Sequence, residues 1–92
     1  MTTNPVCIRL EQESILQCLK TEAMTAVQTV EAELELDLAA ILKIDTAGVR
    51  ALEGLARTAD QRGIRIRLVN ANVNVYKALL LLSLVRRFTF AN

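Results

Sequence analysis

Residues 36–48 read Leu-Asp-Leu-Ala-Ala-Ile-Leu-Lys-Ile-Asp-Thr-Ala-Gly, an apolar stretch that stops at an acid, a hydroxyl and two small residues. The apolar residues that follow recur with helical spacing and predict a helix over residues 49–62. Thr46 then lies where the first backbone N–H groups of a helix are unpaired and the helix dipole is positive. A hydroxyl at that point can cap the helix, contact a partner or accept a phosphate group.

Three short segments alternate strictly between apolar and polar residues: 6–10, 34–38 and 64–68. Alternation with a period of two indicates strands that have one buried face and one polar face. The polar positions are basic in the third segment, include Arg9 in the first, and are acidic in the second. If the acidic strand lies between the other two, opposite charges pair across the sheet and help to set its register.

Helical periodicity separates these strands. It predicts helices over residues 17–31, 49–62 and 72–82, followed by a short final strand over residues 87–90. We expect Gly63 to end the second helix, and Asn70 or Asn72 to cap the third.

The order of strands and helices predicts an α/β fold with parallel pairing through right-handed crossovers. Because the strands have a polar face, the helices should pack on the other face only. We therefore expect a single domain, residues 1–92, built as two layers. One layer is a mostly parallel mixed sheet of about four strands, and the other consists of the helices.

The third predicted helix is apolar around almost its whole circumference. Its apolar residues and those just after it are Val73, Val75, Tyr76, Ala78, Leu79, Leu80, Leu81, Leu82, Leu84 and Val85. A helix at the edge of a two-layer domain buries about one face. The rest is covered by the final strand or by a second copy of the chain, or it forms an apolar docking patch for another protein.

Composition excludes several classes of function. The chain has a net charge of +1, no histidine, no tryptophan and three aromatic residues, Tyr76, Phe88 and Phe90. Without histidine the commonest general base and metal ligand is missing, so we expect no enzyme activity, no metal and no cofactor. Neither the charge nor the few aromatic side chains favour binding of nucleic acid.

The two cysteines, Cys7 and Cys18, lack a CxxC spacing and are expected to be reduced and structural. The first residues have neither a basic region nor an apolar core of the kind found in export signals, so we expect a cytoplasmic protein. The longest apolar run, residues 78–82, is far too short to span a bilayer, and we expect no direct membrane insertion.

Residues 36–49 resemble the STAS domain family, in which an apolar strand ends in Asp-Ser/Thr-small-Gly before a helix. The resemblance extends through residues 59–70 and 75–79 and covers about residue 8 to the end of the chain. It departs at residues 12–15, where the family usually has a Gly-Glu-Leu-Asp-like turn, and at Ser83, where a Gly-Leu pair commonly follows the third helix. The family's first strand, normally paired as a hairpin with the next, would have to be formed by residues 1–5.

The resemblance implies a protein-binding module without catalysis, similar to anti-sigma factor antagonists. In those proteins the hydroxyl residue after the Asp is phosphorylated, which matches Thr46 here. The partner is an anti-sigma factor that is also a kinase: the unmodified antagonist binds it, and phosphorylation ends the binding. The partner-binding residues are then expected to be Asp45, Thr46, Ala47, Gly48, Arg50, Glu53 and Tyr76.

A second possibility comes from small STAS proteins of Mla-type lipid ABC transporters, which carry Asp-Thr-Gly-Gly at this place. The pair Val75-Tyr76 also matches that subgroup, in which the threonine loop would dock on the ATPase subunit without phosphorylation. A third possibility is a STAS domain that acts as a dimerising scaffold, a homodimer formed through the third helix.

Each residue of the motif also has a purely structural interpretation. Thr46 or Asp45 can be a helix cap, and Gly48 can simply permit a close approach of the backbone. Arg50, Glu53 and Arg57 would line one exposed side of the helix and can be a solvated face.

Overall fold

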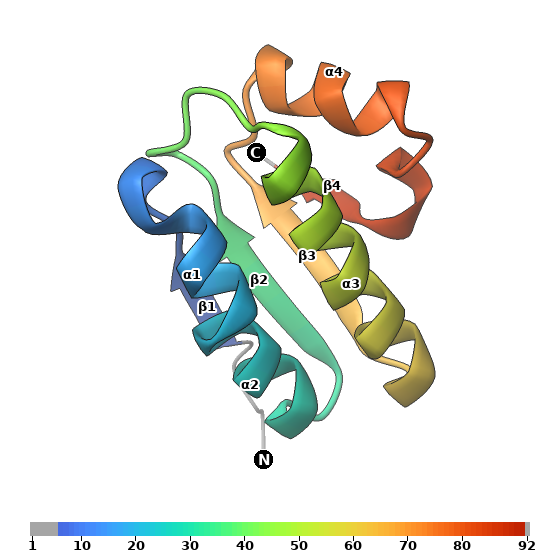
Figure 1. Ribbon diagram of the computed structural model, residues 1–92. Helices are drawn as coiled ribbons and strands as arrows, with labels where there is room; N and C mark the ends of the chain where they lie inside the picture. Colours follow the sequence, from blue (N-terminus) through green and yellow to red (C-terminus); the bar gives the residue numbers. More distant parts are fainter. Residues whose placement is uncertain (1–5, 92) are drawn as a thin grey trace.

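The computed structural model describes residues 6–91, and the expected hairpin strand of residues 1–5 lies outside them. The strands are β1 (Val6–Arg9), β2 (Glu33–Asp37), β3 (Arg65–Val69) and β4 (Thr89–Ala91). The α-helices are α1 (Ile15–Lys20), α2 (Glu22–Thr29), α3 (Thr46–Arg62) and α4 (Val73–Leu81). Two short 3-10 helices, η1 (Gln12–Ser14) and η2 (Val85–Arg87), complete the elements, which are drawn in Figure 1.

The strands form one sheet in the order β1-β2-β3-β4, and all three described pairings are parallel. Leu34 pairs with Ile66 and Leu36 with Leu68, so the apolar positions of neighbouring strands share a face. All four of these side chains are buried, and they belong to one hydrophobic core. The predicted two-layer α/β fold with parallel crossovers is therefore confirmed.

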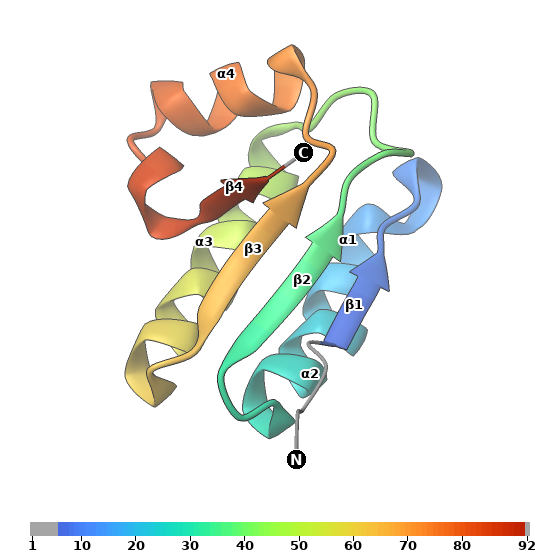
Figure 2. The same cartoon turned by 180° about the vertical axis from the view of Figure 1, so that it is seen from behind.

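The helices α1, α2 and α3 lie on one face of the sheet (Figure 1). The view from behind shows that no helix covers the opposite face (Figure 2). The fourth helix, α4, lies across the end of the sheet at which the strands finish. This end is where loops follow parallel strands, and it is where open α/β sheets usually carry their binding sites.

The uncovered face of the sheet carries the alternating charges expected from the sequence. Glu33 pairs in register with Arg65, and Glu35 with Arg67, so the acidic strand lies next to the basic one. The guanidinium of Arg67 is 4.0 Å from the carboxylates of both Glu33 and Glu35. Ion pairs at this distance on a surface stabilise a fold only slightly, so they set the register more than the stability.

The first helical segment was expected to be one helix over residues 17–31, and this expectation is wrong. The chain forms α1 and α2, which meet at Thr21 with φ −112° and ψ −78°. The Thr21 hydroxyl donates to the carbonyl of Gln17 at 2.7 Å. The backbone N–H of Thr21 donates to the same carbonyl at 2.9 Å, so α1 and α2 remain joined by a bend at Thr21 rather than by a separate loop.

The other elements lie close to their expected positions. Gly63 adopts φ 69° and ends α3, with its N–H directed at the carbonyls of Ala59 and Asp60. The Asn72 carboxamide oxygen accepts the N–H of Val75 at 2.9 Å and caps α4, as one of the two expected residues. No described helix between residues 6 and 91 has the length and hydropathy needed to span a membrane.

Candidate functional site

The motif of residues 45–48 forms the start of α3. Asp45 has extended backbone angles, φ −94° and ψ −180°, and its carboxylate accepts the N–H of Gly48 at 2.8 Å. The Asp45 carbonyl accepts the N–H of Val49 at 2.9 Å, which closes the first turn. Asp45 is therefore the N-cap of the helix, and its negative charge is favourable at this end of the dipole.

Thr46 is the first residue of α3 and is exposed, as is Ala47. Among residues 6–91 its hydroxyl forms no hydrogen bond, because Asp45 already supplies the cap. The interpretation of Thr46 as the cap is therefore wrong. Because the residue is exposed, another molecule can reach this hydroxyl.

Gly48 is the one member of the motif that is buried. It packs directly against the Ile44 side chain, so it contributes to the geometry of the loop rather than to its outer surface. The sequence had left both roles open for this glycine.

The loop between β2 and α3, residues 38–45, is held by a side chain that comes from 30 residues earlier in the chain. The Gln12 carboxamide oxygen accepts the N–H of Leu42 at 2.7 Å and that of Lys43 at 3.2 Å. Its amide nitrogen donates to the Lys43 carbonyl at 3.0 Å. Gln12 lies in the segment that departs from the STAS pattern, and no signal in the sequence indicates this contact.

A second clamp comes from the cap of α4. The Asn72 amide nitrogen donates to the carbonyls of Ile41 at 2.9 Å and Leu42 at 3.0 Å. Since the same side chain caps α4, it joins the loop before α3 to the start of α4. Both clamps act on residues 41–43, so the segment just before Asp45 and Thr46 is anchored to two other parts of the fold.

The end of β2 is tied to the end of β3 beside this loop. The Asp37 carboxylate accepts the backbone N–H of Ala39 at 2.9 Å and the side-chain amide of Asn70 at 3.1 Å. These two hydrogen bonds favour the ionised form and hold the pKa of Asp37 below its ordinary value. The bond from Ala39 makes the larger contribution and the bond from Asn70 the smaller one. Asn70 adopts φ 61°, a conformation that asparagine tolerates better than most residues.

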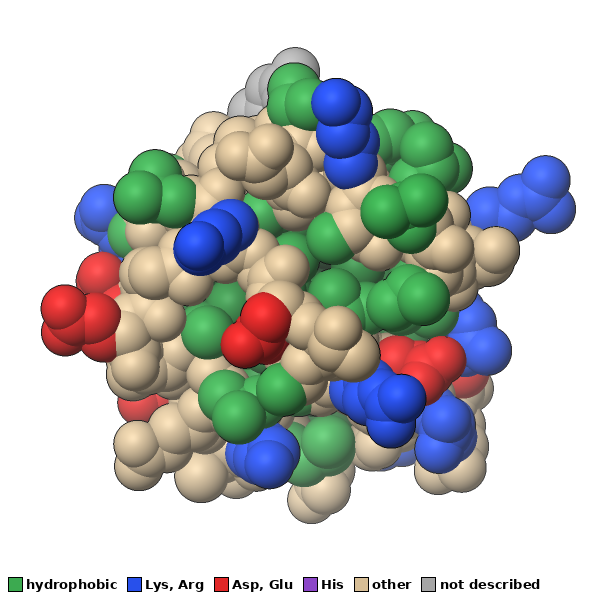
Figure 3. All heavy atoms as spheres, turned by 45° about the horizontal axis from the view of Figure 1, so that its top comes forward, with side chains coloured by type: hydrophobic (Ala, Val, Ile, Leu, Met, Phe, Trp, Pro, Cys, Tyr) green, Lys and Arg blue, Asp and Glu red, His purple; other side chains and the backbone are tan. Residues whose placement is uncertain are grey.

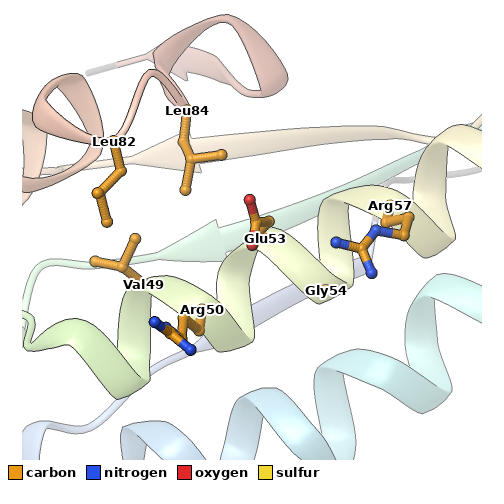
Figure 4. Close-up of a pocket in the computed structure, with 7 residues that line it drawn as sticks. All are labelled: Val49, Arg50, Glu53, Gly54, Arg57, Leu82 and Leu84. Carbon is orange, nitrogen blue, oxygen red and sulfur yellow. The ribbon is translucent and has the colours of Figure 1, made fainter.

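A groove runs along the exposed side of α3, between that helix and the segment after α4 (Figure 4). The side chains of Val49 and Leu82 face each other at one end, and Arg50 and Arg57 flank Glu53 along the helix. The residues that line the groove are Val49, Arg50, Glu53, Gly54, Arg57, Leu82 and Leu84. The three charged residues expected on this side of the helix are therefore brought together.

Tyr76 does not line this groove. It lies on α4, 41% exposed, with its ring edge-on to Phe90 at a centroid distance of 5.2 Å. Exposed apolar side chains continue along and beyond α4, namely Val73, Leu80, Leu81 and Leu82. The final strand does not cover them, and hydrophobic side chains gather in neighbouring patches on this end of the molecule (Figure 3).

The described part of the chain holds no group of three His, Cys, Asp or Glu side chains that could bind a metal ion. Both cysteines are free thiols. Burial raises the pKa of Cys7, with a further contribution from the charge of Glu35, and burial followed by the charge of Glu22 raises the pKa of Cys18. A raised pKa keeps a thiol protonated and weakly nucleophilic. Cys18 packs partly buried against the core, as expected of a structural cysteine, whereas Cys7 is exposed.

Comparisons with known proteins agree with the geometry. The model of the STAS domain family matches residues 9–92. A comparison with curated protein sequences gives no match. Among solved structures, the chain is similar to a Thermotoga maritima protein described as a candidate anti-sigma factor antagonist, with a TM-score of 0.72 and 18% identity over 100% of this chain and 75% of that one.

At that identity the structural similarity shows a shared fold. The family match begins at the last residue of β1 and includes every later element of the sheet and its helices. The resemblance inferred from the Asp-Thr-Ala-Gly motif is confirmed, and the chain belongs to the STAS domain family.

Proposed function

We propose that this chain is a non-enzymatic regulatory module that binds a protein partner through the start of α3 and the exposed side of that helix. The observation that carries the proposal is the position of Thr46, which is exposed at the first turn with no hydrogen bond to residues 6–91. The loop around it is held by Gln12 and Asn72, so the surface is already formed before a partner binds. Binding then costs little conformational entropy for ordering the loop.

The partner of this module is an anti-sigma factor that also acts as a serine/threonine kinase. This assignment follows the family and the structural relative described as a candidate anti-sigma factor antagonist. The unmodified loop binds the partner, and phosphorylation of Thr46 ends the binding.

The charges around Thr46 suit such a switch. A phosphate adds roughly −1.5 to −2 charges at neutral pH. The unpaired N–H groups of the first turn and Arg50, one turn further along the same side, stabilise it within the folded domain. The negative charge of Asp45 lies next to that of the phosphate. A docked protein would have to remove water from both charges, which disfavours binding. One modification can therefore release a partner without unfolding the domain.

The test is phosphorylation of the purified chain by a cognate kinase-type anti-sigma factor, with ATP and detection by mass spectrometry. We expect one phosphate on the wild type and none on Thr46→Ala. Phosphorylation of Thr46→Ala, or no phosphorylation of the wild type by its cognate kinase, would contradict the switch.

A second candidate function is supported by the exposed apolar side chains of α4. Val73 is 65% and Leu80 55% exposed, and they share one side of the helix with Tyr76. Such a surface suits a permanent interface, as expected for an accessory subunit bound to the ATPase of a phospholipid ABC transporter. Co-purification with an ATPase subunit, lost in Leu80→Lys and without any phosphate on Thr46, would support this candidate over the first.

A further inference from the structure

The exposed side of α3 carries cations that have no partner within the described molecule. Arg62, at the end of the helix, donates to the carbonyls of Val27 at 2.7 Å and Val30 at 3.2 Å. Arg50 and Arg57 are exposed and form no ion pair or hydrogen bond with residues 6–91. These two arginines are therefore available for contacts outside the chain.

The acidic residues on the same side of α3 follow the same spacing. Glu53 lies between the two arginines, and Asp60 follows Arg57 by three residues. Along the helix the order is Arg50, Glu53, Arg57 and Asp60, so positive and negative charges alternate about one turn apart.

This pattern is complementary to itself when the helix is reversed. Arg50 and Asp60 are equally far from residue 55, and so are Glu53 and Arg57. If two α3 helices lie antiparallel with a twofold axis near residue 55, each arginine of one copy faces a carboxylate of the other. A twofold contact uses the same patch on both subunits and requires this kind of self-complementarity.

The centre of the pattern also permits close approach. Gly54 lies beside the axis, and a Cβ atom placed there would have no neighbour within 4 Å. The Asp60 carboxylate binds Arg87 through one oxygen at 2.8 Å, which leaves its other oxygen for a second arginine.

We propose that α3 is a homodimer interface, formed by antiparallel packing of this helix against the same helix of a second copy. Arg50 pairs with Asp60 of the second copy, and Glu53 pairs with Arg57 of the second copy. The interface is small and charged, so the dimer is weak, with a dissociation constant on the order of 0.1 mM.

The dimer has a consequence that rests on the proposed function. Arg50 and Glu53 belong to the surface proposed to bind the partner, so the paired helices cover that surface. Self-association and partner binding then compete for one surface, so the dimer weakens partner binding only where the chain is concentrated enough to associate.

Sedimentation equilibrium of the chain alone tests the dimer, at concentrations from about 20 µM to 1 mM and at low salt. Arg57→Glu places two carboxylates opposite each other at both central pairs, and we expect at least a tenfold weaker association. The double variant Glu53→Arg/Arg57→Glu restores opposite charges across the axis and is expected to dimerise like the wild type. Added salt of about 0.5 M should also weaken the wild-type dimer, because exposed ion pairs are screened.

Leu80→Lys, on the apolar side of α4, serves as the control and should leave the association unchanged. A wild type that stays monomeric at about 1 mM would overturn the proposal. So would failure of the double variant to dimerise while its circular dichroism is native, or loss of the dimer in Leu80→Lys. None of these measurements uses a partner or modifies Thr46. The dimer can therefore be disproved while the proposed function holds, and the proposed function can be disproved while the dimer holds.

Discussion

Gly48 lies so close to Ile44 that a Cβ atom on residue 48 would stand 2.7 Å from Ile44 Cγ1. No ordinary side-chain contact is that short, so the isoleucine or the first turn of α3 must move if residue 48 acquires a side chain. The glycine of the motif is thus required by the packing beneath the loop, and the exposed Thr46 depends on it for its position.

Gly48→Ala is therefore expected to lower the free energy of unfolding by about 1 kcal/mol, since the overlap outweighs the better helix propensity of alanine. Gly54→Ala is the matched control in the same helix, where a Cβ atom meets nothing within 4 Å. It should raise the free energy of unfolding by up to about 1 kcal/mol. Urea unfolding of both variants measures the difference, and equal effects would contradict the packing argument.

Gln12→Ala should loosen the loop that carries the motif, because three hydrogen bonds to Leu42 and Lys43 are lost. We expect the amides of these two residues to exchange with solvent at least tenfold faster, and the protein to lose about 1–2 kcal/mol of stability. Glu13→Ala, in the same 3-10 turn and exposed, is the control. Unchanged exchange at Leu42 in Gln12→Ala would show that the clamp does not hold the loop.

Arg62→Ala should destabilise the domain by roughly 1.5–3 kcal/mol, since hydrogen bonds from a charged donor to the carbonyls of Val27 and Val30 are lost. Arg57→Ala removes an arginine from the same helix that has no such contact, and its effect should stay within about 0.5 kcal/mol. Thermal and urea unfolding compare the two. Similar losses in both variants would mean that Arg62 does not join α3 to α2.

The pH dependence of stability should include a contribution from Asp37. Its pKa is lowered in the folded protein, so the stability that it contributes is complete above the unfolded pKa of about 3.9 and is lost as the pH falls through the lower folded value. Nuclear magnetic resonance titration of the carboxyl group should give a midpoint below the ordinary one. Asn70→Gly, which keeps the positive φ but removes the amide, should move that midpoint upward; no movement would contradict the hydrogen bond as a cause.

The sheet and α3 could be predicted from the sequence because their signals are local. Alternation in residues 34–38 predicted the bounds of β2 to within one residue. Gly63 marked the end of α3, because the helix ends in a positive φ that glycine adopts without strain. The motif residue Thr46 was identified from the same local pattern. The break at Thr21 was missed, because the apolar spacing continues through it without interruption.

The setting of the site could not be predicted, since it depends on contacts between residues far apart in the chain. Gln12 reaches Leu42 across 30 residues, and nothing in the local sequence of either residue indicates the pairing. The groove beside α3 arises because Ser83, with φ 59°, turns the chain after α4 so that Leu82 and Leu84 line it. The sequence showed an excess of apolar residues there without showing which of them would be buried.

The central claim is that Thr46 lies in the surface that binds the partner, and the most direct measurement is the affinity of the cognate anti-sigma factor for Thr46→Glu, by isothermal titration calorimetry. Thr25→Glu, at an exposed position of α2, is the matched control. We expect Thr46→Glu to weaken binding by at least about 100-fold, through a charge buried at the interface, and Thr25→Glu to bind like the wild type. Equal affinities of wild type and Thr46→Glu would contradict the account.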